Sequence, residues 1–178
     1  MSDPKTLFER WYAVPLRLLE TLPNGDGAFV ALSVSLALYE RFAKAFIKND
    51  LKQKANETAF IKKLASDFAI SESEATTFWD VMRHGLQHQA MPMQSGQGKN
   101  DKPKWLVNGD LPKAIQYGKS GQEEVLLIQP WLFRDNVLAM YETRPDLIAA
   151  SQSFPWASIF PVEFSAEQGV APDCGGIT

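Results

Sequence analysis

The helix predicted for residues 28–48 limits most strongly what this chain can fold into. Its sequence, AFVALSVSLALYERFAKAFIK, repeats apolar side chains at helical spacing and is apolar around most of its circumference in its first half. Such a helix must be covered on most sides by other elements. The apolar stretch between Asp26 and Glu40 is too short to span a bilayer. The sequence therefore predicts a buried central helix in a mainly α fold.

Three further helices are predicted before residue 93. The first begins at Asp3 and Pro4, a capping residue followed by a residue suited to the first helical position, and Pro15 should kink or split it. Another covers about 56–69. A capping box of Ser71 and Glu74 starts the fourth, which Pro92 ends. The core stripe of the fourth helix is Ala75, Phe78, Met82 and Leu86.

The period of the sequence changes after residue 95. A polar, glycine-containing loop over 93–103 is followed by three short strands, with NGD as a hairpin turn after the first, and by a fifth helix at about 131–143. A Pro- and aromatic-rich tail should pack on the surface as coil. We expect a mainly α bundle, residues 1–95, with a small antiparallel β meander inserted before the last helix. Residues 96–178 should belong to the same compact domain.

Charge and cysteine content narrow the function classes. The net charge of −3 argues against a large nucleic-acid footprint, but residues 91–120 carry 5 Lys against 2 Asp. A polyanion should therefore bind locally, around the bundle and this lysine-containing loop, and not over the whole surface. The single cysteine, Cys174, cannot form an intrachain disulfide and fits a reducing compartment. With no apolar run at the start of the chain, these features predict a cytoplasmic protein.

Both histidines of the chain lie on the predicted fourth helix. Asp80, His84 and His88 follow at steps of four, which places them on one helix face. One interpretation is a hydrated surface on which Asp80 hydrogen-bonds His84. A second is a metal site to which these three side chains and Glu40 contribute.

A third interpretation takes Arg83 with His88. The segment RHGLQH resembles the R-x4-6-H signature of the HEPN superfamily (higher eukaryotes and prokaryotes nucleotide-binding domains), in which the position after the Arg, here His84, is polar. The resemblance covers roughly residues 5–92 as a helical bundle. Glu40 and Lys44 are similar to an acidic-basic pair that some members carry on an earlier helix. The β element and the fifth helix lie outside the minimal family fold.

The resemblance implies a metal-independent endoribonuclease without a cofactor, often a homodimer in which the motifs of two subunits meet at a cleft. Many such domains act in toxin-antitoxin systems or phage defence, so RNA and an antitoxin or regulatory protein are the implied partners, and no membrane. Other members have lost activity and serve as binding modules. The alternative is therefore a non-catalytic helical module for a partner protein or nucleotide.

The side chains themselves suit RNA cleavage. RNA carries its own nucleophile, the 2′-hydroxyl, so an enzyme needs to move protons and stabilise charge on phosphorus. Histidine titrates near neutrality and arginine presents a charged fork to phosphate oxygens. We expect His88 as the acid or base and Arg83 at the scissile phosphate. His84 should bind or orient the substrate, with Glu40 and Lys44 as further substrate-binding candidates.

The spacing of the motif has a geometric consequence. Five residues along an ideal helix rotate by about 140°, so Arg83 and His88 do not share a face. Gly85 between them weakens the helix locally. In a symmetric dimer, Arg83 of one subunit can instead approach His88 of the other. The enzyme interpretation therefore predicts a homodimer.

Overall fold

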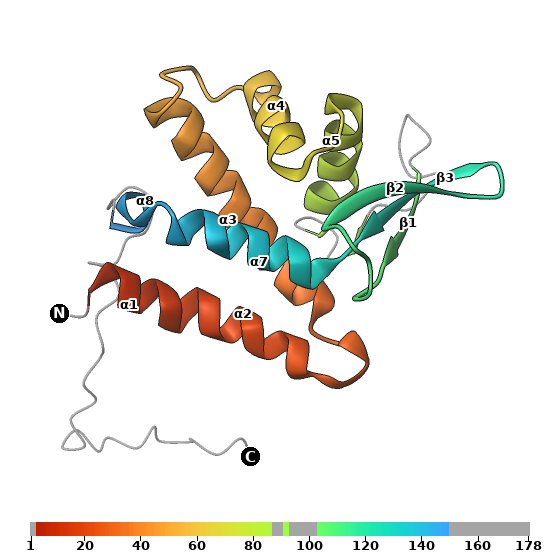
Figure 1. Ribbon diagram of the computed structural model, residues 1–178, viewed down its shortest axis with the longest axis horizontal. Helices are drawn as coiled ribbons and strands as arrows, with labels where there is room; N and C mark the ends of the chain where they lie inside the picture. Colours follow the sequence, from red (N-terminus) through yellow and green to blue (C-terminus); the bar gives the residue numbers. More distant parts are fainter. Residues whose placement is uncertain (1–2, 87–90, 93–102, 150–178) are drawn as a thin grey trace, which may run out of the picture.

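The computed structural model of the chain describes residues 3–86, 91–92 and 103–149. Its elements follow the predicted order, and the expected fold class, mainly α with a small β element, is confirmed (Figure 1). The predicted loop over 93–103 lies almost wholly outside the described residues, and the predicted tail from Gln152 onward lies wholly outside them. Residues 87–90, which the prediction places in the last turn of the fourth helix, also lie outside them, while Pro92 itself is described and is not helical. Within the described part of the chain, no helix is long and apolar enough to cross a membrane.

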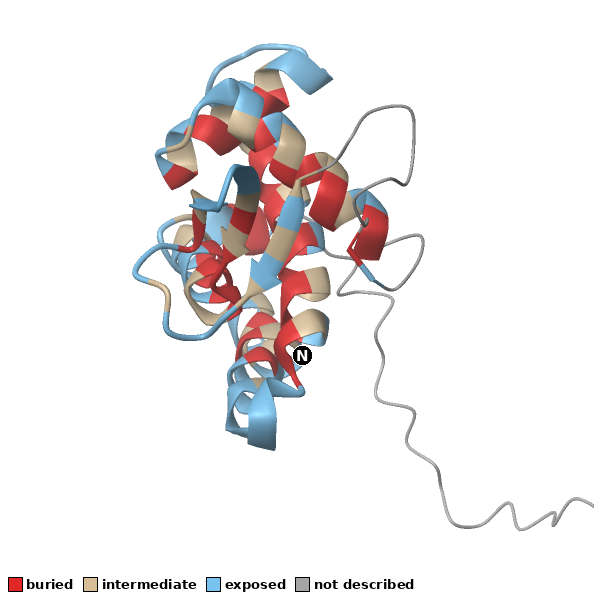
Figure 2. Ribbon diagram, turned by 90° about the vertical axis from the view of Figure 1, so that its right-hand side faces the viewer, coloured by how far each residue is buried: buried red, intermediate tan, exposed pale blue. Residues whose placement is uncertain are grey.

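The central helix is α3, Ala28–Asn49, and it is buried as its sequence predicts. Ten of its residues are buried, and α7, Pro130–Glu142, packs along it. The hydroxyl of Tyr141 on α7 donates to the carbonyl oxygen of Leu38 on α3 at 2.9 Å. Because burial raises the pKa of Tyr141, this hydroxyl stays a donor at any physiological pH. Figure 2 shows buried positions gathered where the elements face one another, with exposed positions on the outer sides.

The N-terminal helix crosses the opposite side of α3 from α4 and α5 (Figure 1). It consists of α1, Pro4–Phe8, a π-helical turn, Glu9–Ala13, and α2, Val14–Leu18. Asp3 caps it by accepting from the amide of Thr6, as predicted. Pro15 does not split the helix. Because proline cannot donate to the preceding turn, the chain instead widens into the π turn just before it.

Two shorter helices complete the bundle. Helix α4, Glu57–Phe68, is capped by Asn56, and α5, Glu72–Phe78, begins with the predicted capping box of Ser71 and Glu74. A second π-helical turn, Trp79–His84, continues α5. The predicted core stripe of this helix is buried at all four positions, Ala75, Phe78, Met82 and Leu86.

The sheet differs from the predicted antiparallel meander. Its strands are β1, Lys104–Val107, β2, Ile115–Ser120, and β3, Glu123–Ile128, in the order β1-β3-β2. β2 and β3 form an antiparallel hairpin, but β1 pairs with β3 in parallel. The apolar strand β3 takes the middle position, where both of its edges are hydrogen-bonded. The NGD segment after β1 is therefore no hairpin turn, since residues 108–114 carry the chain past β3.

The end of the described chain holds one helix more than predicted. The fifth helix is confirmed as α7, and the expected stop at Arg144 and Pro145 leads into a further short helix, α8, Pro145–Ala149. Pro145 is tolerated because it occupies the first turn of α8, where its missing N–H has no helical partner. The sheet is tied to the bundle by the hydroxyl of Tyr117, which donates to the carbonyl oxygen of Glu74 at 2.7 Å.

Candidate functional site

Four of the five predicted site residues lie together. Glu40 and Lys44 come from the middle of α3, and Arg83 and His84 come from the π-helical turn after α5. All four line one surface pocket of about 400 Å³, together with residues at the start of α4. The fifth, His88, lies outside the described residues. The structure thus places side chains from segments 43 residues apart around one cavity.

Glu40 is the point at which the two helices are joined electrostatically. Its Oε2 accepts from Nε and Nη2 of Arg83, each at 3.3 Å, and its Oε1 accepts from Nζ of Lys44 at 2.5 Å. Burial alone would raise the pKa of Glu40. The hydrogen bond and charge of Lys44, together with the charge of Arg83, outweigh burial and lower this pKa below its ordinary value. Glu40 is therefore ionised at neutral pH and holds both cations at the pocket.

Glu40 and Lys44 are paired, but the carboxylate of Glu40 does not suit the predicted role of binding the substrate. A carboxylate repels phosphate, and both oxygens of Glu40 already accept from cations. We therefore interpret Glu40 as the residue that orients Arg83 and Lys44, which leaves the two cations as the groups suited to contact an anion. Their exposure fits this division: the side chain of Lys44 is 53% exposed, against 21% for Glu40.

His84 lies at the solvent-facing part of the pocket. Its Nε2 is 4.0 Å from Oδ1 of Asp80. That separation is longer than a direct hydrogen bond between these two atoms, and it is short enough for an electrostatic contact. About half of the His84 side chain is exposed, which leaves it accessible to a ligand.

The π-helical turn shapes this end of the pocket. Such turns insert one extra residue into a helix and occur frequently at functional sites. Here the turn keeps Trp79, Val81 and Met82 in the core while Arg83 and His84 remain at the surface. The sequence pattern alone gave no sign of this extra residue, because the apolar spacing of the fourth helix fits an ordinary α-helix equally well.

Several pocket residues were not predicted from the sequence. Trp79 and Phe60 form an apolar wall, with ring centroids 4.4 Å apart, and Asn56 lies at the rim, where its side chain also caps α4. Asn56 was visible in the sequence only as a helix start. The loop that leads into α4 brings it to the pocket, and loop paths have no periodic signal.

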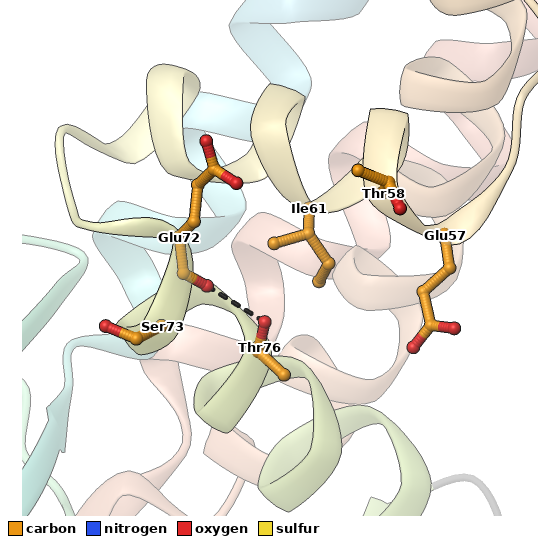
Figure 3. Close-up of a pocket in the computed structure, with 6 residues that line it drawn as sticks. All are labelled: Glu57, Thr58, Ile61, Glu72, Ser73 and Thr76. Atoms are coloured by element: carbon orange, nitrogen blue, oxygen red, sulfur yellow. Dashed lines mark hydrogen bonds between the residues drawn. The ribbon is translucent and has the colours of Figure 1, made fainter.

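A second pocket has a different character. It lies between the starts of α4 and α5, has a volume of about 320 Å³ and carries two carboxylates, Glu57 and Glu72 (Figure 3). Hydroxyl groups of Thr58, Ser73 and Thr76 complete it, and Thr76 donates to the carbonyl oxygen of Glu72 at 2.9 Å. Among the residues that the structure describes, no Lys or Arg lines this pocket, so its charge suits a phosphate less well than the pocket of Arg83.

The metal interpretation is weakened by the surroundings of Glu40. Among the described residues, no three metal-ligating side chains gather in one place. The carboxylate that would complete a site with Asp80 and His84 is instead held between Arg83 and Lys44, and two cations there disfavour a third. His88, the remaining predicted ligand, lies outside the described part of the chain.

No protein-family model, curated protein or solved structure matches this chain. The chemistry of its own residues therefore carries the functional argument.

Proposed function

We propose that this chain is a metal-independent endoribonuclease of HEPN type, whose site consists of Arg83, His88, His84 and Lys44, held in part by Glu40. The observation that supports it best is the junction between Arg83 and Glu40. It brings the arginine of the R-x4-H motif and the acidic-basic pair of α3 to one open pocket. An arginine oriented by a carboxylate at a cavity is suited to binding a phosphate in a fixed geometry.

The reaction requires only proton transfers and charge stabilisation. The 2′-hydroxyl loses its proton as its oxygen bonds to phosphorus, and the bond from phosphorus to the 5′-oxygen breaks. That oxygen gains a proton, so the products are a 2′,3′-cyclic phosphate and a 5′-hydroxyl end. His88 moves a proton in this scheme, and Arg83 binds the phosphate oxygens on which negative charge accumulates. His84 and Lys44 bind the flanking phosphate or sugar.

The proposal includes a homodimer, because Arg83 and His88 are five residues apart. Most of the apolar residues of α3 are buried within the subunit and are not available for this contact. The outer face of the N-terminal half of α3 is better suited. It carries small exposed side chains, Val30 and Ala37, on the same side of the helix as Lys44. A second copy packed there lies next to the pocket, as a site shared by two subunits requires.

The cellular setting follows from the same proposal. A ribonuclease that cleaves RNA without a cofactor must be controlled, which fits a toxin or phage-defence effector in the cytoplasm with an antitoxin or regulatory protein as partner. The alternative is a non-catalytic module that binds a partner protein or nucleotide. The edges of Trp79 and Phe60 that line the pocket suit a nucleobase, which fits a bound nucleotide as well as an RNA substrate.

The test is cleavage of total RNA by folded variants. His88→Ala should lower the rate by ~10²–10⁴-fold, the usual range for a positioned acid or base. Arg83→Ala should lower it by ~10²–10³-fold, the usual range for the loss of one donor that stabilises transition-state charge. Arg17→Ala removes an arginine with two carboxylate partners elsewhere on the surface and should cleave like the parent. His84→Asn should keep appreciable activity.

Mixed dimers test whether the site is shared. Arg83→Ala and His88→Ala subunits, mixed and re-equilibrated, should regain part of the activity because one of the two sites is then intact. Equal cleavage by the parent and both alanine variants contradicts the proposal. A folded parent that binds RNA or nucleotide but cleaves nothing supports the binding module instead.

A further inference from the structure

The strongest local concentration of positive charge lies directly beside the pocket of Arg83. Residues 41–54 contain five basic residues and one acidic residue, in a chain whose net charge is −3. The acidic residue is Asp50, which accepts from Nη1 of Arg144 at 2.9 Å, so its charge is compensated. This segment therefore has an excess of positive charge that the chain as a whole lacks.

The lysines of this segment continue from the rim of the pocket. Lys44 lines the pocket, and Lys48 lies one turn further along the same face of α3, about 6 Å along the helix axis. Lys52 and Lys54 follow in the loop that joins α3 to α4. All four lysines are exposed. Lys48, Lys52 and Lys54 make no ion pair with any residue that the structure describes.

The loop is fixed in position, so these lysines form a defined surface. The amide of Gln53 donates to the carbonyl oxygen of Ile47 at 3.1 Å, which folds the loop back onto the end of α3. Lys52 adopts a left-handed backbone conformation, φ 55°, at this reversal. The loop then returns to the pocket, because Ala55 and Asn56 line its rim. The surface thus begins at Lys44, which lines the pocket, and ends at Lys54, directly before the pocket residues Ala55 and Asn56.

We propose that Lys44, Lys48, Lys52 and Lys54, the lysine track, bind the phosphates of a single RNA strand on one side of the bond that is cleaved. This inference rests on the proposed function for the identity of the polyanion. The charge pattern suits a ligand with repeated negative charges. Because the track adjoins the pocket, we identify this ligand with the RNA strand that enters the pocket. Exposed lysines on a loop bind phosphates without reading the base sequence, so the track supplies affinity and position.

The experiment separates binding from cleavage by using an RNA strand with 2′-O-methyl groups, which lacks the nucleophile. The full chain is compared with the triple variant Lys48→Gln, Lys52→Gln and Lys54→Gln over a range of salt concentrations. Each phosphate contact contributes about 0.7 to the slope of log affinity against log salt for single strands. The triple variant should therefore lose roughly 2 units of slope and bind at least about tenfold more weakly at low salt.

A matched triple variant controls for total charge. Lys5→Gln, Arg10→Gln and Lys62→Gln remove the same charge from exposed side chains on α1, on the π-helical turn after it and on α4. This control should keep the affinity and slope of the parent. An equal loss in both triple variants overturns the track, as does the absence of strand binding by the parent. If the track variant loses the binding of the parent to phosphatidylserine vesicles but keeps its RNA binding, the lysines bind a membrane surface. That result also overturns the proposal.

The outcomes for the track and for the proposed function are distinguishable. If the track variants bind the 2′-O-methyl strand weakly but the parent cleaves no ordinary RNA, the track stands and the nuclease fails. If the parent cleaves RNA and the track variants bind and cleave like the parent, the nuclease stands and the track fails.

Discussion

Arg83 is the residue on which the account of the site depends. Its guanidinium makes two contacts to a single oxygen of Glu40 at the edge of the pocket. The π-helical turn keeps this side chain off the core stripe of its helix, so its substitution leaves the apolar packing in place. Changes at this position therefore report on the site itself.

Arg83→Lys separates charge from geometry. A lysine keeps the positive charge but presents a point charge in place of a planar fork, so it cannot reproduce paired contacts to phosphate. We expect cleavage to fall by at least about tenfold, with the thermal midpoint close to that of the parent. The rate of cleavage and the unfolding curve are measured on the same preparation. Parent-like cleavage by this variant contradicts a paired contact to the phosphate.

Glu40→Gln tests the electrostatic role of the carboxylate. The pKa of Glu40 is lowered in the folded chain, so ionised Glu40 stabilises the fold at pH values above the ordinary carboxyl range, and this contribution is lost as the pH falls through the lowered pKa. At about pH 7 the variant should be less stable by ~0.2–1 kcal/mol, the range for a partly exposed ion pair. The difference should vanish in acid.

Denaturant unfolding of parent and variant at several pH values measures this difference. The same variant should cleave RNA more slowly, because Arg83 and Lys44 lose the group that orients them. A stability difference that does not change with pH contradicts this role of the Glu40 charge.

At the scale of elements, the helices were predictable and their local geometry was not. The capping box at Ser71 and the buried stripe of the fourth helix could be predicted because capping and apolar spacing are local signals. The two π-helical turns and the parallel pairing of β1 with β3 depend on contacts between distant segments. Likewise, the resemblance pointed to Glu40 and Lys44 as an acidic-basic pair on one helix, but the contact of Glu40 with Arg83 depends on how the helices pack.

The capping box provides a prediction for the helix that carries Arg83. Ser71→Ala removes the acceptor for the amide of Glu74 and should cost about 1 kcal/mol of unfolding free energy. Ser71→Asn keeps a side-chain acceptor and should recover most of the loss. Denaturant unfolding measures both variants. Equal stability of Ser71→Ala and the parent contradicts the contribution of the cap.

In the molecule as a whole, two exposed apolar surfaces among the described residues are candidates for the contact of the proposed dimer. One is the outer face of α3 around Ala37. The other is the N-terminal helix, on which Trp11, Val14 and Leu18 are exposed. This helix lies across the molecule from α5 in Figure 1, so a dimer built on it holds the two pockets apart. The shared site therefore requires the α3 face.

Two matched substitutions distinguish these surfaces. Ala37→Glu places a charge in the proposed contact and should convert the dimer to a monomer with loss of cleavage, while its exposed position spares the fold. Leu18→Glu introduces the same charge on the other surface and should leave both the dimer and cleavage unchanged. Light scattering gives the mass of each variant. A dimer that survives Ala37→Glu but is lost in Leu18→Glu contradicts the shared site.

The most direct measurement of the central claim is the chemistry of the cleaved ends. The purified chain is incubated with an RNA strand and with a DNA strand of the same sequence, in the presence of EDTA. Cleavage of the RNA alone is expected, with 2′,3′-cyclic phosphate and 5′-hydroxyl ends, because in the proposed reaction the nucleophile is the 2′-hydroxyl and no metal takes part. Cleavage of the DNA, or RNA cleavage that is lost with EDTA and restored by Zn²⁺ or Mn²⁺, contradicts the claim.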